Sequence, residues 1–200
     1  MLRLYDSRLS GNCYKVRLLL TLLDIPVERI EVDVVDRSNR LELLGGKNLA
    51  LRVPTLELED GTYLAESNAI LWYFADGTVY LPDDRLARAR VLQWLFFEQY
   101  DVEPNLAVAR FWISILGKED EYAERLDEKW KGGYRALDGM ERHLDGRAFL
   151  VGDRMSIADI ALYAYTHVAE EGGFDLGRYP AIRGWLSRVA DQPGHVPLLD

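Results

Sequence analysis

Cysteine and histidine are scarce in this chain, and each shortage excludes a kind of chemistry. The 200 residues include one cysteine, Cys13, so no intramolecular disulfide can form. The fold is therefore expected to owe nothing to oxidation and to suit a reducing cytoplasm. The three histidines, at 143, 167 and 195, lie far apart without the short spacing of metal ligands. The sequence predicts no metal site.

Basic side chains and long apolar runs are also in short supply. There are 24 lysines and arginines against 33 acidic residues, a formal net charge of −9. Nucleic acid or an anionic membrane would require a basic surface, so neither is an expected partner. No apolar run approaches the roughly 18 residues of a membrane span, and the N-terminal MLRLYDS lacks the regions of a signal peptide. We expect a soluble, unexported, cytoplasmic protein.

What remains is an ordinary globular composition. Apolar residues make up 48% and charged residues 28% of the chain, which argues against disorder. A chain of this length can bury a sizeable core, in one large domain or two small ones.

The N-terminal third begins with a strand, helix and strand pattern. Residues 2–6 fit a short strand, and residues 11–24 carry apolar side chains at helical spacing. Pro26 ends that helix, and residues 27–34 alternate as a second strand. Such a tight succession predicts a right-handed parallel β-α-β unit.

A second set of elements follows a polar, turn-rich stretch at residues 37–48. Two short strands flank Asp60-Gly61, a pair favoured in hairpin turns, and should be antiparallel. Ser67 is then expected to cap a helix that closes at Gly77. Residues 1–77 thus have the order β-α-β-β-β-α, which is that of a thioredoxin-like domain.

The pattern changes after a linker at residues 78–84. Strand patterns disappear, and residues 85–200 are expected to form an all-helical domain. The first of these helices carries apolar bulk on two faces, one of them bearing Trp94 and Phe97, so it requires two neighbours. The fold class is therefore α/β plus all-α.

Three local features are expected within the helical half. Pro104 should kink or split the first long helix, and Gly132-Gly133 should weaken a later one. The clearest helix start has Ser156 as cap and Asp159 three residues later, a capping-box pattern.

The stretch SGNCYK stands where the first strand passes into the first helix. A cysteine in place of Ser10 would give C-x-x-C with Cys13, the redox motif of thioredoxin-like domains. The stretch is therefore either a redox site that lacks one sulfur or a site for a thiol brought by a ligand.

Four stretches in this order resemble the cytosolic glutathione transferases. They are SRLSGNCYKVRLLL, RVPTLELEDG, LAESNAILWYFA and FLVGDRMSIADIALYAY. The likeness extends over essentially the whole chain and is to serine-type members, theta- or beta-like in the bacterial style. It implies the glutathione transferase fold, glutathione as co-substrate without a metal, and a homodimer, which the face bearing Trp94 and Phe97 permits.

The resemblance also assigns glutathione-binding residues. It implies that Pro54 is cis and that the main chain of Val53 pairs with the cysteinyl part of glutathione. Glu66 and Ser67 match the motif that binds the γ-glutamyl end. Arg52 stands where basic residues often reach the glycine carboxylate, and Arg40 and Lys47 are weaker candidates. The family often has Asn-Pro-x-Gly before this point, whereas residues 48–52 read NLALR, which leaves the path of this loop open.

The resemblance further places the catalytic hydroxyl at Ser10, at the entrance to the first helix. There it can donate to the sulfur of glutathione while the helix N-terminus favours negative charge. Tyr5 lies too early, inside the strand. Cys13 is expected to face the core as an inert thiol, and Asn12 is a further residue near the sulfur.

The predicted reaction is attack of the glutathione thiolate on a small hydrophobic electrophile. The acceptor would lie between the first domain and the kinked helix, near residues that serve core packing equally well: Leu9, Tyr14, Asn105, Ala109, Trp112 and Tyr165. Two alternatives stay open. One is a glutathione-dependent disulfide or peroxide reductase, and the other is a noncatalytic binding module on the same fold.

Overall fold

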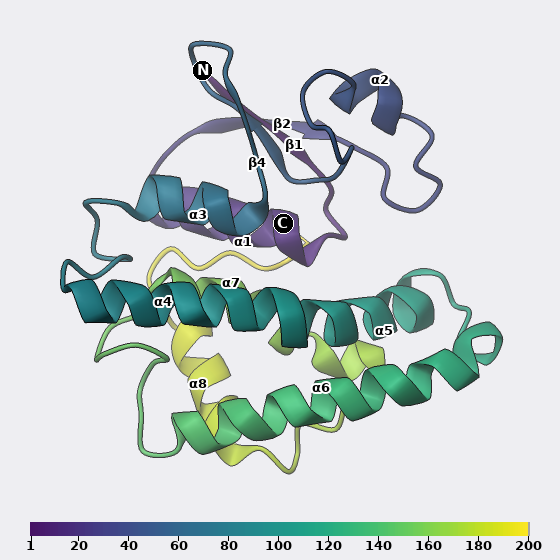
Figure 1. Ribbon diagram of the computed structural model, residues 1–200, viewed down its shortest axis with the longest axis vertical. Helices are drawn as coiled ribbons and strands as arrows, with labels where there is room; N and C mark the ends of the chain where they lie inside the picture. Colours follow the sequence, from purple (N-terminus) through teal and green to yellow (C-terminus); the bar gives the residue numbers. More distant parts are fainter. Residues whose placement is uncertain (200) are drawn as a thin grey trace. The chain divides into compact units, whose positions relative to one another are not determined.

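The computed structural model describes residues 1–199 and divides into two compact units (Figure 1). Unit 1 comprises Met1–Thr78 together with the C-terminal segment that starts at Pro193. Unit 2 comprises Val79–Gln192. The division differs from the expected one at its end, because the last residues of the chain pack within the first unit rather than the helical one.

Unit 1 is built on a four-stranded mixed sheet in the order β2-β1-β3-β4. Strands β1 (Leu2–Asp6) and β2 (Val27–Glu31) are parallel, whereas β3 (Thr55–Glu57) runs antiparallel to both β1 and β4 (Tyr63–Ala65). The predicted parallel unit and the predicted hairpin are both confirmed.

Successive residues of β1 face opposite sides of the sheet. Leu4 packs in a core cluster with residues of helices α1 (Gly11–Leu22) and α3 (Ser67–Ala75). Tyr5 packs on the other side with Leu44 of helix α2 (Arg40–Leu44). The sequence predicts only a turn-rich stretch at α2, since five residues are too few to show helical periodicity.

The C-terminal segment is held in unit 1 by side chains from β1, α1 and the loop between them. The Tyr14 hydroxyl donates to the Val196 carbonyl at 2.7 Å, and Nη2 of Arg17 donates to the Leu198 carbonyl at 2.6 Å. Nη1 of Arg17 also pairs with the buried Asp6 at 2.6 Å. These contacts satisfy buried polar groups that would otherwise be costly.

Unit 2 begins with one long helical run in which the hydrogen-bond spacing changes. Helix α4 (Arg85–Phe97) continues into the π-helical η1 (Glu98–Ala107), then α5 (Val108–Arg110) and the π-helical η2 (Phe111–Ile115). Pro104 lies inside η1. The expected distortion thus takes the form of a wider turn that accommodates the missing N–H of proline without a break.

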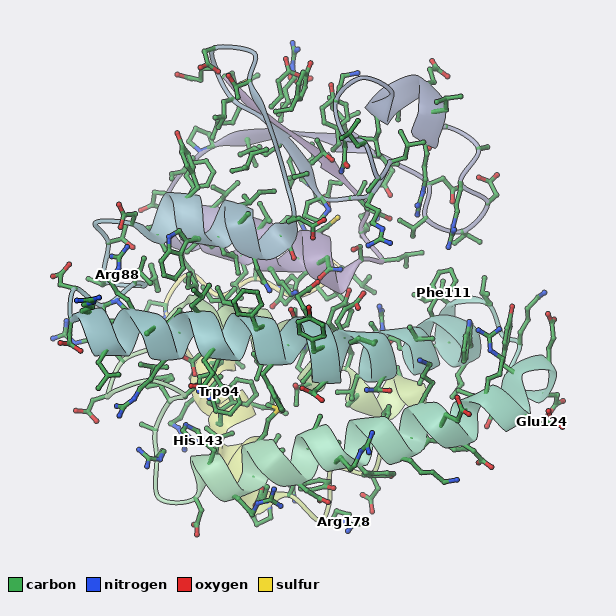
Figure 2. All side chains as sticks on the ribbon, in the orientation of Figure 1. Arg88, Trp94, Phe111, Glu124, His143 and Arg178 are labelled. Atoms are coloured by element: carbon green, nitrogen blue, oxygen red, sulfur yellow. The ribbon has the colours of Figure 1, made fainter. Side chains whose placement is uncertain are left out.

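The aromatic face of α4 packs inside unit 2 and is not the exposed face. Trp94 makes edge contacts with Phe97 at 5.2 Å and with His143 of α6 (Ala123–Leu144) at 4.7 Å between ring centroids. Figure 2 shows Trp94 and His143 pointing toward one another between the two helices. The large apolar side chains left exposed on this run are Leu86, Leu92, Phe96 and Tyr100.

Helix α6 runs unbroken through Gly132 and Gly133, contrary to the expected weakening. A Cβ at Gly132 would lie 2.5 Å from Oδ1 of Asn105, and one at Gly133 would lie 2.3 Å from the ring of Phe174. The two glycines therefore permit close packing, which offsets their poor helix propensity.

The predicted capping box at the start of α7 (Ile157–Thr166) is confirmed. The Ser156 hydroxyl accepts from a first-turn N–H, and the carboxylate of Asp159 accepts from the Ser156 N–H at 2.9 Å. The remaining short elements of unit 2 are η3 (Asp120–Tyr122), η4 (Ala169–Gly172) and α8 (Pro180–Ala190). Among residues 1–199, no helix combines the length and the apolar character needed to span a bilayer.

Candidate functional site

Three loops of unit 1 meet at one end of its sheet. Tyr5 pairs with Thr55, and Thr55 pairs with Ala65, so the three residues lie in one row across β1, β3 and β4. The loop that leaves β1, the loop that enters β3 and the turn that leaves β4 all lie just beyond this row. The register therefore brings together segments that are about 45 and 60 residues apart in the sequence.

The loop that leaves β1 ends in the N-cap of α1. Ser10 has extended backbone geometry, with φ −87° and ψ 120°, and its Oγ accepts from the Cys13 N–H at 3.3 Å. A hydroxyl offers one donor as well as two acceptor sites, so accepting this bond does not use the Ser10 proton. The side chain is half-buried, at the positive end of a twelve-residue helix.

Cys13 is enclosed in the core of unit 1. It is fully buried, and burial raises the pKa of its thiol far above the ordinary value, with the nearby Asp6 carboxylate adding to the effect. A thiol held in its protonated form is a poor nucleophile. Its burial agrees with the expected packing role.

The first turn of α1 is linked to the start of α3 by a buried lysine. Nζ of Lys15 donates to Oδ1 of Asn12 at 2.8 Å and to Oγ of Ser67 at 3.4 Å. The Ser67 hydroxyl donates to the same Asn12 oxygen at 3.3 Å. Lys15 is fully buried, and Ser67 nearly so.

The turn that leaves β4 has an uncommon backbone. Glu66 adopts φ +68°, a left-handed value that side chains other than glycine rarely take, and such strain often marks functional sites. Ser67 is the first residue of α3 and not its cap, because its hydroxyl bonds to Asn12 instead of to a first-turn N–H. The predicted capping role of Ser67 is therefore wrong.

The loop that enters β3 contains the cis peptide bond Val53-Pro54, as expected. Asn48 organises the approach to it, since its side-chain nitrogen donates to the Arg52 carbonyl and to Oγ1 of Thr55, both at 2.9 Å. One buried amide thus fixes a loop that lacks the proline and glycine common in the family.

The Tyr5 side chain forms a hydrogen bond within the sheet. Its hydroxyl donates to Oε2 of Glu57 at 3.1 Å, and burial together with this carboxylate raises its pKa to about 12. The hydroxyl therefore has an intramolecular acceptor and a proton that is hard to remove.

The other candidates in unit 1 differ in exposure. Arg52 is exposed and Leu9 is half-buried, whereas Tyr14 is fully buried with its hydroxyl bonded to the C-terminal segment. Arg40 donates to the carbonyls of Asp33 and Leu51, and Lys47 donates to the Leu43 carbonyl. Full burial favours a packing role for Tyr14.

The four candidates of unit 2 are placed by its helices. Asn105, Ala109 and Trp112 follow one another at helical spacing on the run that begins with α4, and Tyr165 lies on α7. The ring of Trp112 stacks on Tyr122 with 4.5 Å between centroids, beneath the guanidinium of Arg125. Nδ2 of Asn105 donates to the Asp101 carbonyl at 2.7 Å.

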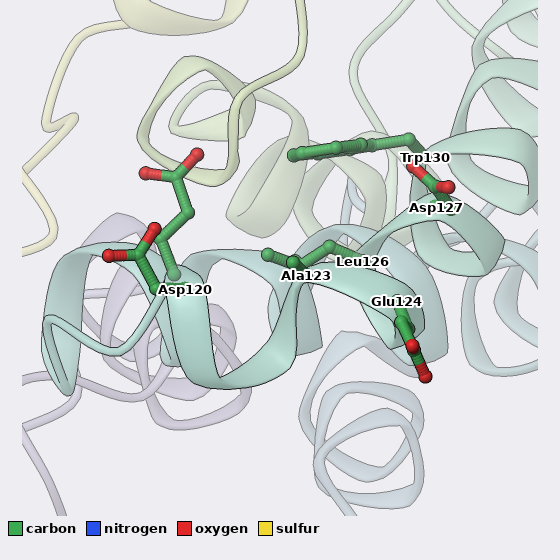
Figure 3. Close-up of a pocket in the computed structure, with 7 residues that line it drawn as sticks. Asp120, Ala123, Glu124, Leu126, Asp127 and Trp130 are labelled. Atoms are coloured by element: carbon green, nitrogen blue, oxygen red, sulfur yellow. The ribbon is translucent and has the colours of Figure 1, made fainter.

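A pocket of about 340 Å³ opens elsewhere in unit 2. It is lined by seven residues around the start of α6, namely Glu119, Asp120, Ala123, Glu124, Leu126, Asp127 and Trp130. Figure 3 shows the carboxylates of Asp120, Glu124 and Asp127 pointing away from one another. Within residues 1–199 no cluster of acidic, histidine and cysteine side chains is suited to a metal ion. None of the sequence-predicted site residues lines this pocket.

Comparison with known proteins decides the family. The model for the glutathione S-transferase N-terminal domain matches residues 4–77, and the model for the C-terminal domain matches residues 90–193. The chain belongs to the glutathione S-transferase family. A solved glutathione S-transferase from Pseudomonas fluorescens is 52% identical, with a TM-score of 0.96 and coverage of 100% of this chain and 99% of that one. The family and the fold expected from the sequence are both confirmed.

Relatives within the family carry different activities. A maleylacetoacetate isomerase from Rhizobium meliloti is 30% identical, covering 90% of this chain and 86% of its own length. A disulfide-bond oxidoreductase from Escherichia coli is 28% identical, and the match covers 92% of this chain and 88% of that protein. A solved family member from Pseudomonas fluorescens with two glutathione molecules bound is 25% identical, with a TM-score of 0.82 and coverage of 96% and 89%. Family membership therefore leaves the reaction undecided.

One residue of the site region was not among the sequence-based candidates. Lys15 stands three residues after Asn12 and directly before an apolar run, so a helix places it over Asn12 on a face that is otherwise buried. A charged side chain in a buried helical face is the signal that could have found it. Its contact with Ser67, 52 residues away, could not be read from spacing.

Proposed function

We propose that the chain binds glutathione at the end of the unit 1 sheet where the three loops meet. The main chain of Val53 pairs with the cysteinyl part, and the Glu66 carboxylate pairs with the γ-glutamyl ammonium. The backbone N–H groups at the N-terminus of α3, including that of Ser67, donate to the α-carboxylate, since a helix N-terminus favours an anion. Support comes from the alignment of these loops by strand register and from the relative that holds glutathione.

Ser10 stabilises the glutathione thiolate in this proposal. The observation that carries it is the Ser10 geometry at the N-terminus of α1, where Oγ accepts from the Cys13 N–H, a bond that does not use the hydroxyl proton. Lowering a thiol pKa by about two units requires about 2.7 kcal/mol. A hydrogen bond to a charged group contributes roughly 1.5–3 kcal/mol, and a helix N-terminus about 0.3–2 kcal/mol. These two effects together are sufficient to lower the pKa of the glutathione thiol by this amount, so the proposal needs no general base.

The thiolate then attacks an electrophilic carbon of a small hydrophobic substrate. The new bond is sulfur to carbon, and the leaving group departs with the electron pair of the bond that breaks. Leu9 and Asn105, which are half-buried, stay proposed acceptor residues, whereas burial of Ala109, Trp112 and Tyr165 favours a packing role, as it does for Tyr14. Arg52, which is exposed, is the proposed partner of the glycine carboxylate.

A second candidate function is a glutathione-dependent disulfide reductase. Asn12 lies two residues after Ser10 and is held by Lys15, and a relative of this chain is a disulfide-bond oxidoreductase. Here the glutathione thiolate attacks one sulfur of a disulfide, the S–S bond breaks and the other sulfur leaves as a thiolate. A second glutathione thiolate then attacks the mixed disulfide, which releases the remaining substrate thiolate and forms glutathione disulfide.

A panel of substrates separates the candidates. Retention on immobilised glutathione with elution by free glutathione tests binding first, and loss of binding would remove both enzymatic proposals. An aryl halide, a peroxide and a mixed disulfide are then compared at equal concentration. Conjugation of the aryl halide faster than turnover of the other two supports the transferase, and the reverse order supports the reductase.

The proposed homodimer uses the exposed apolar face of the α4 run, including Leu92 and Phe96. This face replaces the one bearing Trp94 and Phe97, which is occupied within unit 2. A set of large apolar side chains on one helix face is typical of an interaction surface.

A further inference from the structure

The cluster of Asn12, Lys15 and Ser67 joins the starts of two helices. Lys15 and Asn12 lie on α1, whose cap is Ser10, and Ser67 is the first residue of α3. The three polar atoms lie within 2.8 to 3.4 Å of one another. The sulfur end and the γ-glutamyl end of the proposed glutathione site are therefore connected through one buried ammonium group.

The chemistry of lysine fixes how the other two side chains are oriented. An ammonium group only donates, so the Asn12 atom at 2.8 Å must be the carbonyl oxygen, and the amide nitrogen is on the opposite side. Ser67 accepts from Lys15 and directs its own proton to the same oxygen. Both side chains are thus held in a single orientation before a ligand arrives, which lowers the ordering cost of binding.

The location of the charge is as informative as its hydrogen bonds. A buried ammonium group is costly unless it is paired and hydrogen-bonded. Here it lies 3.4 Å from the first side chain of α3, where the helix N-terminus already carries partial positive charge. The two positive features reinforce each other at the place proposed for the α-carboxylate.

We propose that Lys15 is a positioning residue of the glutathione site, which orients Asn12 and Ser67 and adds the charge that selects the ligand's α-carboxylate. The inference rests on the proposed glutathione site. Lys15 acts in two ways: it holds the Ser67 side chain by a hydrogen bond, and its charge attracts the α-carboxylate of the ligand. A purely structural lysine would stabilise unit 1 without any preference for a carboxylate.

The test compares two ligands in wild type and variants. The ligands are glutathione and 4-aminobutyryl-cysteinylglycine, which keeps the amine and lacks the α-carboxylate, and dissociation constants are measured by calorimetry. Wild type should prefer glutathione by roughly 10-fold to 100-fold, as expected for a charge-assisted bond. Lys15→Gln, which keeps a donor without the charge, should reduce this preference to about threefold or less. Exposed Lys118, in the other unit, gives the matched control Lys118→Gln, with the wild-type preference.

Each outcome bears on the proposal. If Lys15→Gln weakens both ligands equally and leaves the preference unchanged, the lysine is structural and the proposal is overturned. A wild-type protein that binds both ligands equally also overturns it. If Lys15→Gln does not fold, Lys15→Met, which keeps a long side chain without the charge, is measured in its place, and an unchanged preference there overturns the proposal. Failure of wild type to bind glutathione at all refutes the proposed function itself, a result distinct from either of these.

Discussion

Alanine at Gly133 should destabilise unit 2 through a clash that the structure locates. A Cβ there would lie 2.3 and 2.5 Å from ring atoms of Phe174 and 2.9 Å from Cδ1 of Leu106. Phe174 is buried and packs edge-on against Tyr134, with 5.3 Å between centroids, so its ring has little room to withdraw. Overpacking of this kind costs about 1–3 kcal/mol, and a contact this short belongs at the upper end.

The helix itself gains from the same substitution. Replacing an interior glycine by alanine improves helix propensity by about 1 kcal/mol. The net loss is therefore about 2 kcal/mol, which for a chain of this size lowers the melting temperature by about 4–8 °C. Urea unfolding followed by circular dichroism measures the loss as a lower midpoint with an unchanged slope.

Gly139 provides the matched control in the same helix. Its Cβ would meet only Cζ of Phe97 at 3.9 Å, an ordinary contact, so Gly139→Ala should stabilise by about 0.5–1 kcal/mol. Adding Phe174→Leu to Gly133→Ala should cost less than the sum of the two single changes, because the smaller side chain relieves the clash. A Gly133→Ala protein as stable as Gly139→Ala would refute the packing explanation.

Three further predictions concern the cysteine, the C-terminal segment and the dimer. Cys13 should resist iodoacetamide at about pH 8 in the folded protein, because burial raises its pKa, and rapid labelling by intact mass would contradict this. Burial lowers the pKa of His195 below 6.5, so the detached segment binds a proton first as the pH falls, and docking should weaken below about pH 6.5. The protection of residues 193–199 against hydrogen exchange, after correction for the slower intrinsic exchange at low pH, should fall between about pH 7.5 and 5.5 in wild type and stay level in His195→Gln. Phe96→Glu should yield a folded monomer by sedimentation, whereas Phe97→Glu should lower stability by disrupting the contact with Trp94; a dimeric Phe96→Glu would exclude this face.

Much of the fold follows from local patterns in the sequence. Alternation and helical spacing predict β1, α1 and β2 in parallel arrangement, and Ser156 with Asp159 predicts the start of α7, since these patterns involve neighbours along the chain. Short elements carry too little pattern, which is why α2 is not predicted. Gly132 and Gly133 lead to a wrong prediction of helix weakening, because helix propensity describes an isolated helix. In the folded protein these glycines allow Asn105 and Phe174 to pack closely against α6.

The site is predictable only in part, because local sequence patterns do not show contacts between residues that are far apart in the chain. Ser10, Pro54 and Glu66 lie in short motifs that can be recognised in the sequence. The structure shows that the strand register aligns the loops that carry them. Ser67 reads as a cap because serine before a helix usually is one, and only its contact with Lys15 and Asn12 shows otherwise. The C-terminal segment belongs to unit 1 through bonds to Tyr14 and Arg17 that span more than 180 residues. No local pattern records such contacts.

The central claim is that the Ser10 hydroxyl stabilises the thiolate of bound glutathione. Ultraviolet absorbance of the thiolate against pH gives its pKa in the complex, and it should be measured in wild type, Ser10→Ala and Ser10→Thr. Loss of a bond worth roughly 1.5–3 kcal/mol should raise this pKa by about 1–2 units in Ser10→Ala. Ser10→Thr keeps both the hydroxyl and the cap and should stay near wild type. An unchanged thiolate pKa in a folded Ser10→Ala protein that still binds glutathione would contradict the account.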